Sequence, residues 1–122
     1  LTDFVEGPRL LPQVRHTALW VEGDRLFLLY TRIGDRPESI LLATADLRAD
    51  WQNWSFSEPV CLLEPEMEWE GVQQPLAPSR SGAIKGQVRQ LRDPAFYAEG
   101  DARYVLYSVA GEQGIAIARL LY

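Results

Sequence analysis

The sequence predicts an all-β protein built from antiparallel strands. Apolar and aromatic segments of strand length alternate with turn residues, and no stretch has the pattern of a three-turn amphipathic helix. The same set of segments also recurs in the same order along the chain, which is typical of repeated structural units. We expect strands over residues 17–22, 25–31, 39–45, 55–63, 95–98, 103–109 and 114–121.

The turns between these segments have recognisable chemistry. Gly23-Asp24 separates the first two segments, and the same Glu-Gly-Asp sequence returns at Gly100-Asp101. Glycine next to a small acidic residue favours the tight turn of a β-hairpin. After the second segment, Arg32 and Asp35 are expected to form an ion pair that stabilises their loop.

Other residues between and within the segments are expected to be structural. Residues 47–51 are predicted to make one short helical turn. Trp20, Trp51 and Trp54 are predicted to pack in the core, and Cys61 is interpreted as a small buried apolar side chain on a strand.

Two sequence matches define the repeat. Residues 15–24 align without gaps on residues 92–101, an offset of 92 − 15 = 77, and residues 27–31 continue the match on 104–108. A shorter match has an offset of 56 − 4 = 52 and pairs Phe4, Glu6, Leu10 and Leu11 with Phe56, Glu58, Leu62 and Leu63.

Both offsets are explained by units of four antiparallel strands. Residues 1–12 would be the last strand of one unit, 14–65 a complete unit, 66–90 an inserted loop, and 91–122 three strands of the next unit. Such units are typical of β-propeller blades, and the set would make about two blades; the alternative is a compact β-sandwich. A set this small leaves apolar faces open, so we expect a homo-oligomer or further blades that complete it.

Composition excludes several classes of function. The chain has 122 residues, with 12 basic and 17 acidic side chains and a net charge of −5, which disfavours nucleic-acid binding. Its single cysteine, Cys61, excludes an internal disulfide, and its single histidine, His16, excludes a multi-histidine metal site. We expect no cofactor, no metal and no membrane partner. No signal peptide is visible in this chain, which favours a cytoplasmic location.

Several short motifs resemble a known enzyme group. They are the segments 32–38 and 91–95, the tripeptide Trp69-Glu70-Gly71, and the segment 107–112. Together they resemble the C-terminal part of five-bladed β-propeller proteins of glycoside hydrolase family 43 and the related families 32, 68 and 130. The resemblance covers nearly all of this chain.

The resemblance implies a polar, funnel-shaped site that binds or hydrolyses a glycoside. Such enzymes pair a carboxylic acid with a carboxylate base. The implied catalytic residues are Asp93, Glu70 and Glu112, and the implied carbohydrate-binding residues are Arg92, His16, Arg15, Trp69 and Arg32. The family's base lies upstream of the matched region, so the alternative is a non-catalytic sugar-binding or self-assembling β-module.

Each candidate also has a structural interpretation. Asp93 precedes a proline and could cap a strand entry, and His16 could be a hydrogen-bonded structural residue. Glu70 and Trp69 could belong to a solvated acidic loop whose indole packs against a sheet, and Glu112 could be a turn residue.

Overall fold

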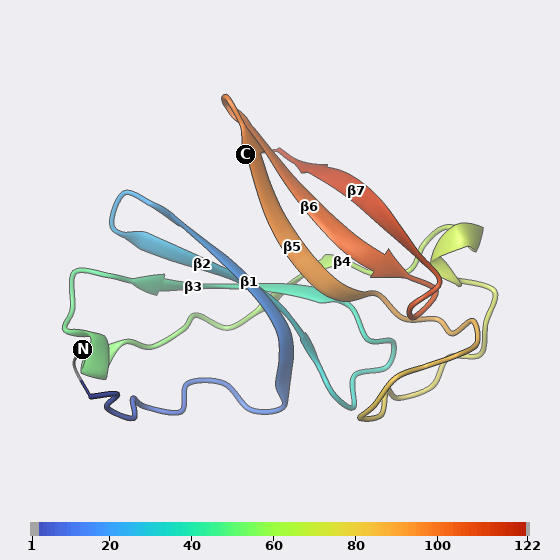
Figure 1. Cartoon of the computed structure of the whole chain (residues 1–122), viewed down its shortest axis with the longest axis horizontal. Helices are drawn as coiled ribbons and strands as arrows, with labels where there is room; N and C mark the ends of the chain where they lie inside the picture. The colour runs from blue at the N-terminus through green and yellow to red at the C-terminus, as the bar shows by residue number, and fades with distance from the viewer. Residues whose placement is uncertain (1–2, 122) are drawn as a thin grey trace.

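The computed structural model describes residues 3–121 and contains two antiparallel β-sheets (Figure 1). The all-β prediction is confirmed. The N-terminal sheet has the order β1-β2-β3-β4, and the C-terminal sheet has the order β5-β6-β7. The strands are β1 (Val14–Glu22), β2 (Arg25–Arg32), β3 (Ile40–Asp46), β4 (Val60–Leu63), β5 (Arg92–Glu99), β6 (Ala102–Val109) and β7 (Gly114–Leu120), with short 3-10 helices η1 (Trp51–Asn53) and η2 (Glu68–Glu70).

Both sheets open with the same hairpin. Glu22 lies opposite Arg25 across the β1–β2 turn, and Glu99 lies opposite Ala102 across the β5–β6 turn. Each turn contains a glycine in the left-handed region, with φ of 57° at Gly23 and 56° at the equivalent glycine of the second hairpin. A residue with a Cβ is disfavoured there, which explains why the Glu-Gly-Asp sequence is repeated.

The repeat extends to an irregularity in the first strand of each sheet. The pairing of β1 with β2 shifts register after Arg15, and that of β5 with β6 shifts after Arg92. The next residue has a positive φ in both cases, 53° at His16 and 48° at Asp93. Such β-bulges bend a strand and redirect its side chains. The two bulges therefore lie at equivalent positions of the repeat and have the same backbone conformation at His16 and Asp93.

The principal core lies between the two sheets. Trp20 of β1 stacks on Phe27 at 4.8 Å between ring centroids and on Phe96 of β5 at 4.3 Å. In Figure 1, β1 runs beside β5, so the first strands of the two sheets form the contact. The buried side chains of this core are Trp20, Leu29, Ile40, Leu91, Val105, Tyr107 and Val109.

A second, smaller cluster lies on the other face of the N-terminal sheet. Its buried members are Leu28, Tyr30, Leu41 and Ala43, and three further side chains cover them: Leu11, Val14 and Phe56. We call this the outer face of the N-terminal sheet.

The expected membership in a five-bladed, family 43-like propeller is wrong. The described chain forms one four-stranded and one three-stranded sheet that pack on each other, an arrangement consistent with the sandwich alternative. The motifs behind the resemblance have local roles instead. Arg32 Nε donates to Asp35 Oδ1 at 2.9 Å, as predicted, and Gly71 ends η2 with φ of 87°. Turn and bulge residues of this kind suit many hairpin proteins, so they do not identify one.

The region around β4 differs from its predicted boundaries. The strand begins at Val60 rather than at residue 55, because Pro59 has no N–H to donate, and Phe56 makes only an isolated bridge with Ala45. The short helical turn lies at Trp51–Asn53, where the Asp50 side chain accepts a hydrogen bond from the backbone N–H of Gln52.

Two burial predictions are also wrong. Trp51 is 41% exposed, and Cys61 is exposed because it lies on the edge strand β4. Trp20 is buried as predicted, and Trp54 is partly buried.

The segment predicted to be a preceding strand is irregular. Residues 3–12 form no strand, and residues 1 and 2 of that prediction lie outside the described residues. Across residues 3–121, no helix is long and apolar enough to cross a membrane.

Candidate functional site

The two bulges meet where the sheets join and form a polar row. His16 Nε2 lies 3.3 Å from Asp93 Oδ1, so the bulge residues of the two sheets contact each other. On one side, Thr31 Oγ1 lies 3.3 Å from His16 Nδ1, and on the other Ser108 Oγ donates to Asp93 Oδ2 at 3.0 Å. Thr31 and Ser108 are themselves equivalent in the repeat. The row therefore combines a hydroxyl, an imidazole, a carboxylate and a second hydroxyl.

A buried ionic network adjoins this row. Arg15 Nε donates to Glu38 Oε1 at 2.8 Å, and Arg92 Nε lies 3.5 Å from Glu38 Oε2. Arg92 also donates from Nη1 to Glu112 Oε1 at 2.9 Å and from Nη2 to Gln90 Oε1 at 2.7 Å. The side chains of Arg92 and Glu38 are both fully buried. One carboxylate thus binds the equivalent arginines of both sheets and ties the sheets together. We call this set and the polar row the junction.

The charge of Glu38 is stabilised within this network. Burial by itself would raise the pKa of its carboxyl. The hydrogen-bonded ion pair with Arg15 opposes that effect most strongly, and the net result is a pKa below the ordinary value. Glu38 is therefore ionised in the folded protein at neutral pH. It is a structural anion of the junction, since its oxygens are enclosed.

Only part of the junction is accessible. The side chains of His16 and Asp93 are 29% and 47% exposed, and that of Glu112 is 36% exposed. Thr31 is fully buried, and its hydroxyl donates to the backbone carbonyl of Arg15. The hydroxyl–imidazole–carboxylate row therefore lacks an accessible nucleophile at its threonine end. The reachable chemistry is that of an imidazole with two carboxylates.

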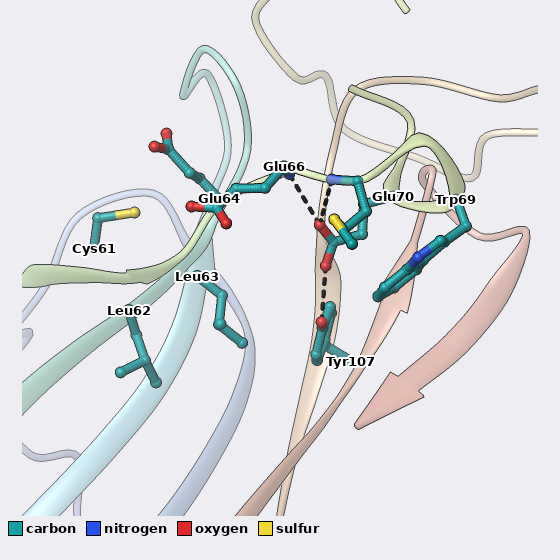
Figure 2. A pocket seen from close by; sticks show the side chains of 9 residues that line it. Cys61, Leu62, Leu63, Glu64, Glu66, Trp69, Glu70 and Tyr107 are labelled. Carbon is teal, nitrogen blue, oxygen red and sulfur yellow. Dashed lines mark hydrogen bonds between the residues drawn. The ribbon is translucent and has the colours of Figure 1, made fainter. Parts of the chain in front are cut away.

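A separate cleft lies between β4, η2 and β6 (Figure 2). It has a volume of about 470 Å³, within the usual range of ligand pockets. Leu62 and Leu63 form an apolar wall, and the indole of Trp69, 53% exposed, lies across the cleft from them. Glu64 and Glu66 also line the cleft, with their carboxylates on the side away from Trp69 (Figure 2). The cleft therefore combines an aromatic surface with hydrogen-bond acceptors.

Glu70 lies in this cleft, but its carboxylate is buried and hydrogen-bonded within the chain. It is 5% exposed, and its Oε2 accepts from the backbone N–H groups of Glu66 at 2.9 Å and Met67 at 3.0 Å. Its Oε1 accepts from the Tyr107 hydroxyl at 2.8 Å (Figure 2). Burial and this bond to a carboxylate raise the pKa of Tyr107 well above its ordinary value. Glu70 is therefore the buried anchor of its loop and not, as the structural interpretation expected, a residue of a solvated acidic loop.

The candidate residues from the sequence thus lie in three places. Arg15, His16, Arg92, Asp93 and Glu112 come together at the junction. Trp69 and Glu70 lie in the cleft, and Arg32 pairs with Asp35 in the loop after β2.

Sequence reasoning missed four residues of the junction. They are Glu38, Thr31 and Ser108, together with Gln90 as a fourth, and their one signal in the sequence is polarity near strand ends. The catalytic and binding roles expected for the junction residues stay predictions. Among residues 3–121, no three His, Cys, Asp or Glu side chains are grouped so that they could hold a metal ion.

Cys61 borders the cleft without a base beside it. Partial burial and the nearby Glu64 raise the pKa of its thiol. A raised pKa disfavours the thiolate, so the cysteine lacks the electropositive surroundings of a nucleophile.

Comparison with known proteins gives one informative result. No known family matches this chain, and no solved structure matches it. The chain does have a viral relative. "Uncharacterized protein R118" of Acanthamoeba polyphaga mimivirus is 41% identical over 119 residues, which cover 97% of this chain and 33% of the relative. The chain therefore spans about a third of that relative's length. The expected assignment to glycoside hydrolase family 43 is not supported by any family match, which together with the fold overturns it.

Proposed function

We propose that this protein binds a carbohydrate in the cleft beside Trp69. The observation that carries the proposal is a half-exposed indole facing an opening that also contains acidic side chains. An aromatic face suits the apolar C–H face of a sugar ring, and ionised carboxylates accept hydrogen bonds from its hydroxyl groups. Glu64 and Glu66 are the acceptors at this site, and Leu62 and Leu63 supply the opposite apolar wall.

Binding without catalysis is the better-supported activity for the cleft. A glycosidase needs a carboxylic acid that can give its proton to the leaving group. Glu70 accepts hydrogen bonds at both oxygens, all from groups of the chain itself. It is therefore occupied as a loop anchor, and it does not offer a proton to a ligand.

Calorimetric titration with a panel of neutral mono- and oligosaccharides tests this proposal. We expect at least one sugar to bind and the Trp69→Ala variant to lose ten-fold or more in affinity. Trp51→Ala is the matched control, because Trp51 is also an exposed tryptophan on a 3-10 helix but lies outside the cleft. Absence of binding to the whole panel, or equal binding by Trp69→Ala, would reject the cleft as a sugar site.

A second candidate function is hydrolysis of a glycoside at the junction. It is favoured by two partly exposed carboxylates at the junction, those of Asp93 (47%) and Glu112 (36%), with the His16 imidazole 3.3 Å from Asp93 Oδ1. Aryl glycosides report this activity by colour release. Turnover that disappears in Asp93→Asn but survives in Trp69→Ala would place the function at the junction. If no aryl glycoside is turned over and Trp69→Ala loses sugar binding, the hydrolysis candidate fails and sugar binding in the cleft is supported.

A further inference from the structure

The exposed face of the C-terminal sheet is equivalent to a face that the N-terminal sheet buries. The 77-residue offset relates Trp20, Phe27 and Leu29 to Tyr97, Tyr104 and Leu106. The loop before β7 is two residues shorter than the loop before β3, so the offset there becomes 115 − 40 = 75 and relates Ile40 and Leu42 to Ile115 and Ile117. The first set belongs to the core between the sheets. The second set lies on the opposite side of the C-terminal sheet from that core, because strand neighbours alternate between faces. We call it the open face.

Equivalent residues on these two faces differ sharply in exposure. Ile40 is 0% exposed, whereas Ile115 is 78% exposed, and Ile117 is 60% exposed. Tyr97 stacks on Tyr104 with ring centroids 6.1 Å apart, as Trp20 stacks on its own cross-strand neighbour. The open face therefore keeps the apolar and aromatic character of a packed surface. Exposed patches of this kind commonly mark interaction sites.

The molecule also exposes part of the surface that would match the open face. Within the chain, Trp20 packs on Phe96, which lies on the core side of β5. The equivalent of Phe96 in the N-terminal sheet is Leu19, on the outer face and 59% exposed. Val21, 52% exposed, lies on the same face two residues further along β1. The chain thus exposes the open face and the β1 part of the outer face. The rest of the outer face is covered by Leu11, Val14 and Phe56.

The free edge of β7 has a matching strand sequence elsewhere in the chain. In the N-terminal sheet, β4 pairs with β3, but in the described chain no strand pairs with the equivalent edge of β7. Residues 4–11 match residues 56–63 at the offset of 52, and they form no strand here. Phe4 and Val5 in this segment are 107% and 69% exposed. A strand-like sequence and an unpaired edge therefore coexist in one molecule.

The repeat also specifies how that segment would pair. Ile40 lies opposite Leu63 in the N-terminal sheet, which places Ile115 opposite Leu11. At the position of Val60 the segment has Pro8, which an edge strand tolerates when its nitrogen faces away from the ladder. Leu11 covers the outer face together with Val14 and Phe56, so its transfer to a neighbour's β7 would uncover the part of that face beneath Leu11.

We propose that a second copy of this chain packs the outer face of its N-terminal sheet against the open face of the first copy's C-terminal sheet. Residues 4–11 of the second copy become the fourth strand beside β7. The contact is head to tail, since two different surfaces meet, and its repetition gives a closed ring or a fibre.

Sedimentation velocity of single and mixed variants tests the direction of the contact. We expect the native chain to associate as its concentration rises, and both Ile117→Lys and Leu19→Glu to remain 13.8 kDa monomers. Both positions are exposed, so circular dichroism should show native strand content. A 1:1 mixture of the two variants should form dimers only, because one copy keeps an intact open face and the other an intact outer face. Leu76→Lys, at an exposed loop residue, is the control and should associate as the native chain does.

A native chain that stays monomeric at millimolar concentration would overturn the proposal. A mixture that remains monomeric would overturn it as well, because a head-to-tail contact requires that the two variants complement each other.

Engineered cysteines test the strand pairing in a Cys61→Ser background. Opposite residues of an antiparallel pair have Cα atoms about 4.5–5.5 Å apart, which suits a disulfide. Leu11→Cys with Ile115→Cys should give oxidised, covalent multimers on a non-reducing gel. Leu11→Cys with Ile117→Cys, two residues out of register, should give far fewer. A bond within one chain, or equal yields from both pairs, would overturn the addition of a second copy's strand to β7.

Discussion

Arg92 connects the two sheets through a buried ionic network. Its guanidinium is fully buried and contacts Glu38, Gln90 and Glu112, which come from both sides of the junction. Removing one partner from a buried ionic network is costly because it leaves an unpaired charge in a poorly solvated place.

We therefore expect Arg92→Met to lower the free energy of unfolding by about 3–5 kcal/mol. The measurement is urea unfolding followed by tryptophan fluorescence. Arg48→Met is the control, because Arg48 pairs with Asp46 on the surface with 74% of its side chain exposed, and loss of such a solvated pair should change the stability little. Equal effects of the two substitutions would show that the junction does not hold the sheets together.

Glu38 should also make stability depend on pH. Its pKa is lowered in the folded state, so the stabilisation is fully present above the ordinary glutamate value of 4.5 and is lost as the pH falls through the lowered folded value. Thermal unfolding of the native chain between pH 7 and pH 3 should show this loss. The Glu38→Gln variant should be less stable at pH 7 and should lose less stability on acidification. An unchanged pH profile in Glu38→Gln would contradict this assignment.

At the scale of single elements, the loop that carries η2 depends on a close backbone approach. Gly71 has φ of 87°, and a Cβ there would lie 2.4 Å from the carbonyl oxygen of Val88. The same loop contributes Glu70, whose backbone carbonyl accepts from Ala110 N–H. The cleft beside Trp69 therefore rests on a loop held tightly against the C-terminal sheet.

Gly71→Ala should cost more stability than Gly82→Ala. Both glycines have a positive φ, and an alanine in that region costs about 1–2 kcal/mol, but nothing lies within 4 Å of a Cβ at Gly82. The additional loss of stability in Gly71→Ala comes from overlap of the alanine Cβ with the carbonyl oxygen of Val88. This loss should be accompanied by weaker sugar binding. Urea unfolding and calorimetry measure the two effects, and equal losses would show that the loop yields easily.

Much of each element could be predicted from local residues. The two Glu-Gly-Asp turns and the strands around them follow from glycine geometry and apolar patterning, which act over a few residues. The start of β4 was misplaced because the apolar pattern from Phe56 to Leu63 does not show that Pro59 interrupts the ladder. The exposure of Trp51 could not be predicted either, since apolar composition does not reveal which elements lack a covering neighbour.

For the whole molecule, stability should depend on protein concentration. The proposed association would bury the open face and would occur only between folded chains. The melting temperature of the native chain should therefore rise with protein concentration. Ile117→Lys should remove this dependence while leaving the melting temperature of the dilute protein almost unchanged, because Ile117 is 60% exposed in the single chain. Differential scanning fluorimetry over a hundred-fold range of concentration provides the comparison. A melting temperature independent of concentration in the native chain would argue against association.

The sequence alone determined the all-β class, the hairpin turns and the repeat, because these depend on backbone preferences and short-range patterns. Tertiary structure decided which equivalent residues are covered. Ile40 and Ile115 occupy matching positions in similar strands, yet one is buried by the second sheet and the other is exposed. It also brought His16 to Asp93 and Glu38 to both arginines, across separations along the chain that no local pattern encodes. Burial and ion pairing of this kind depend on how sheets pack, and packing is set by contacts between distant parts of the chain.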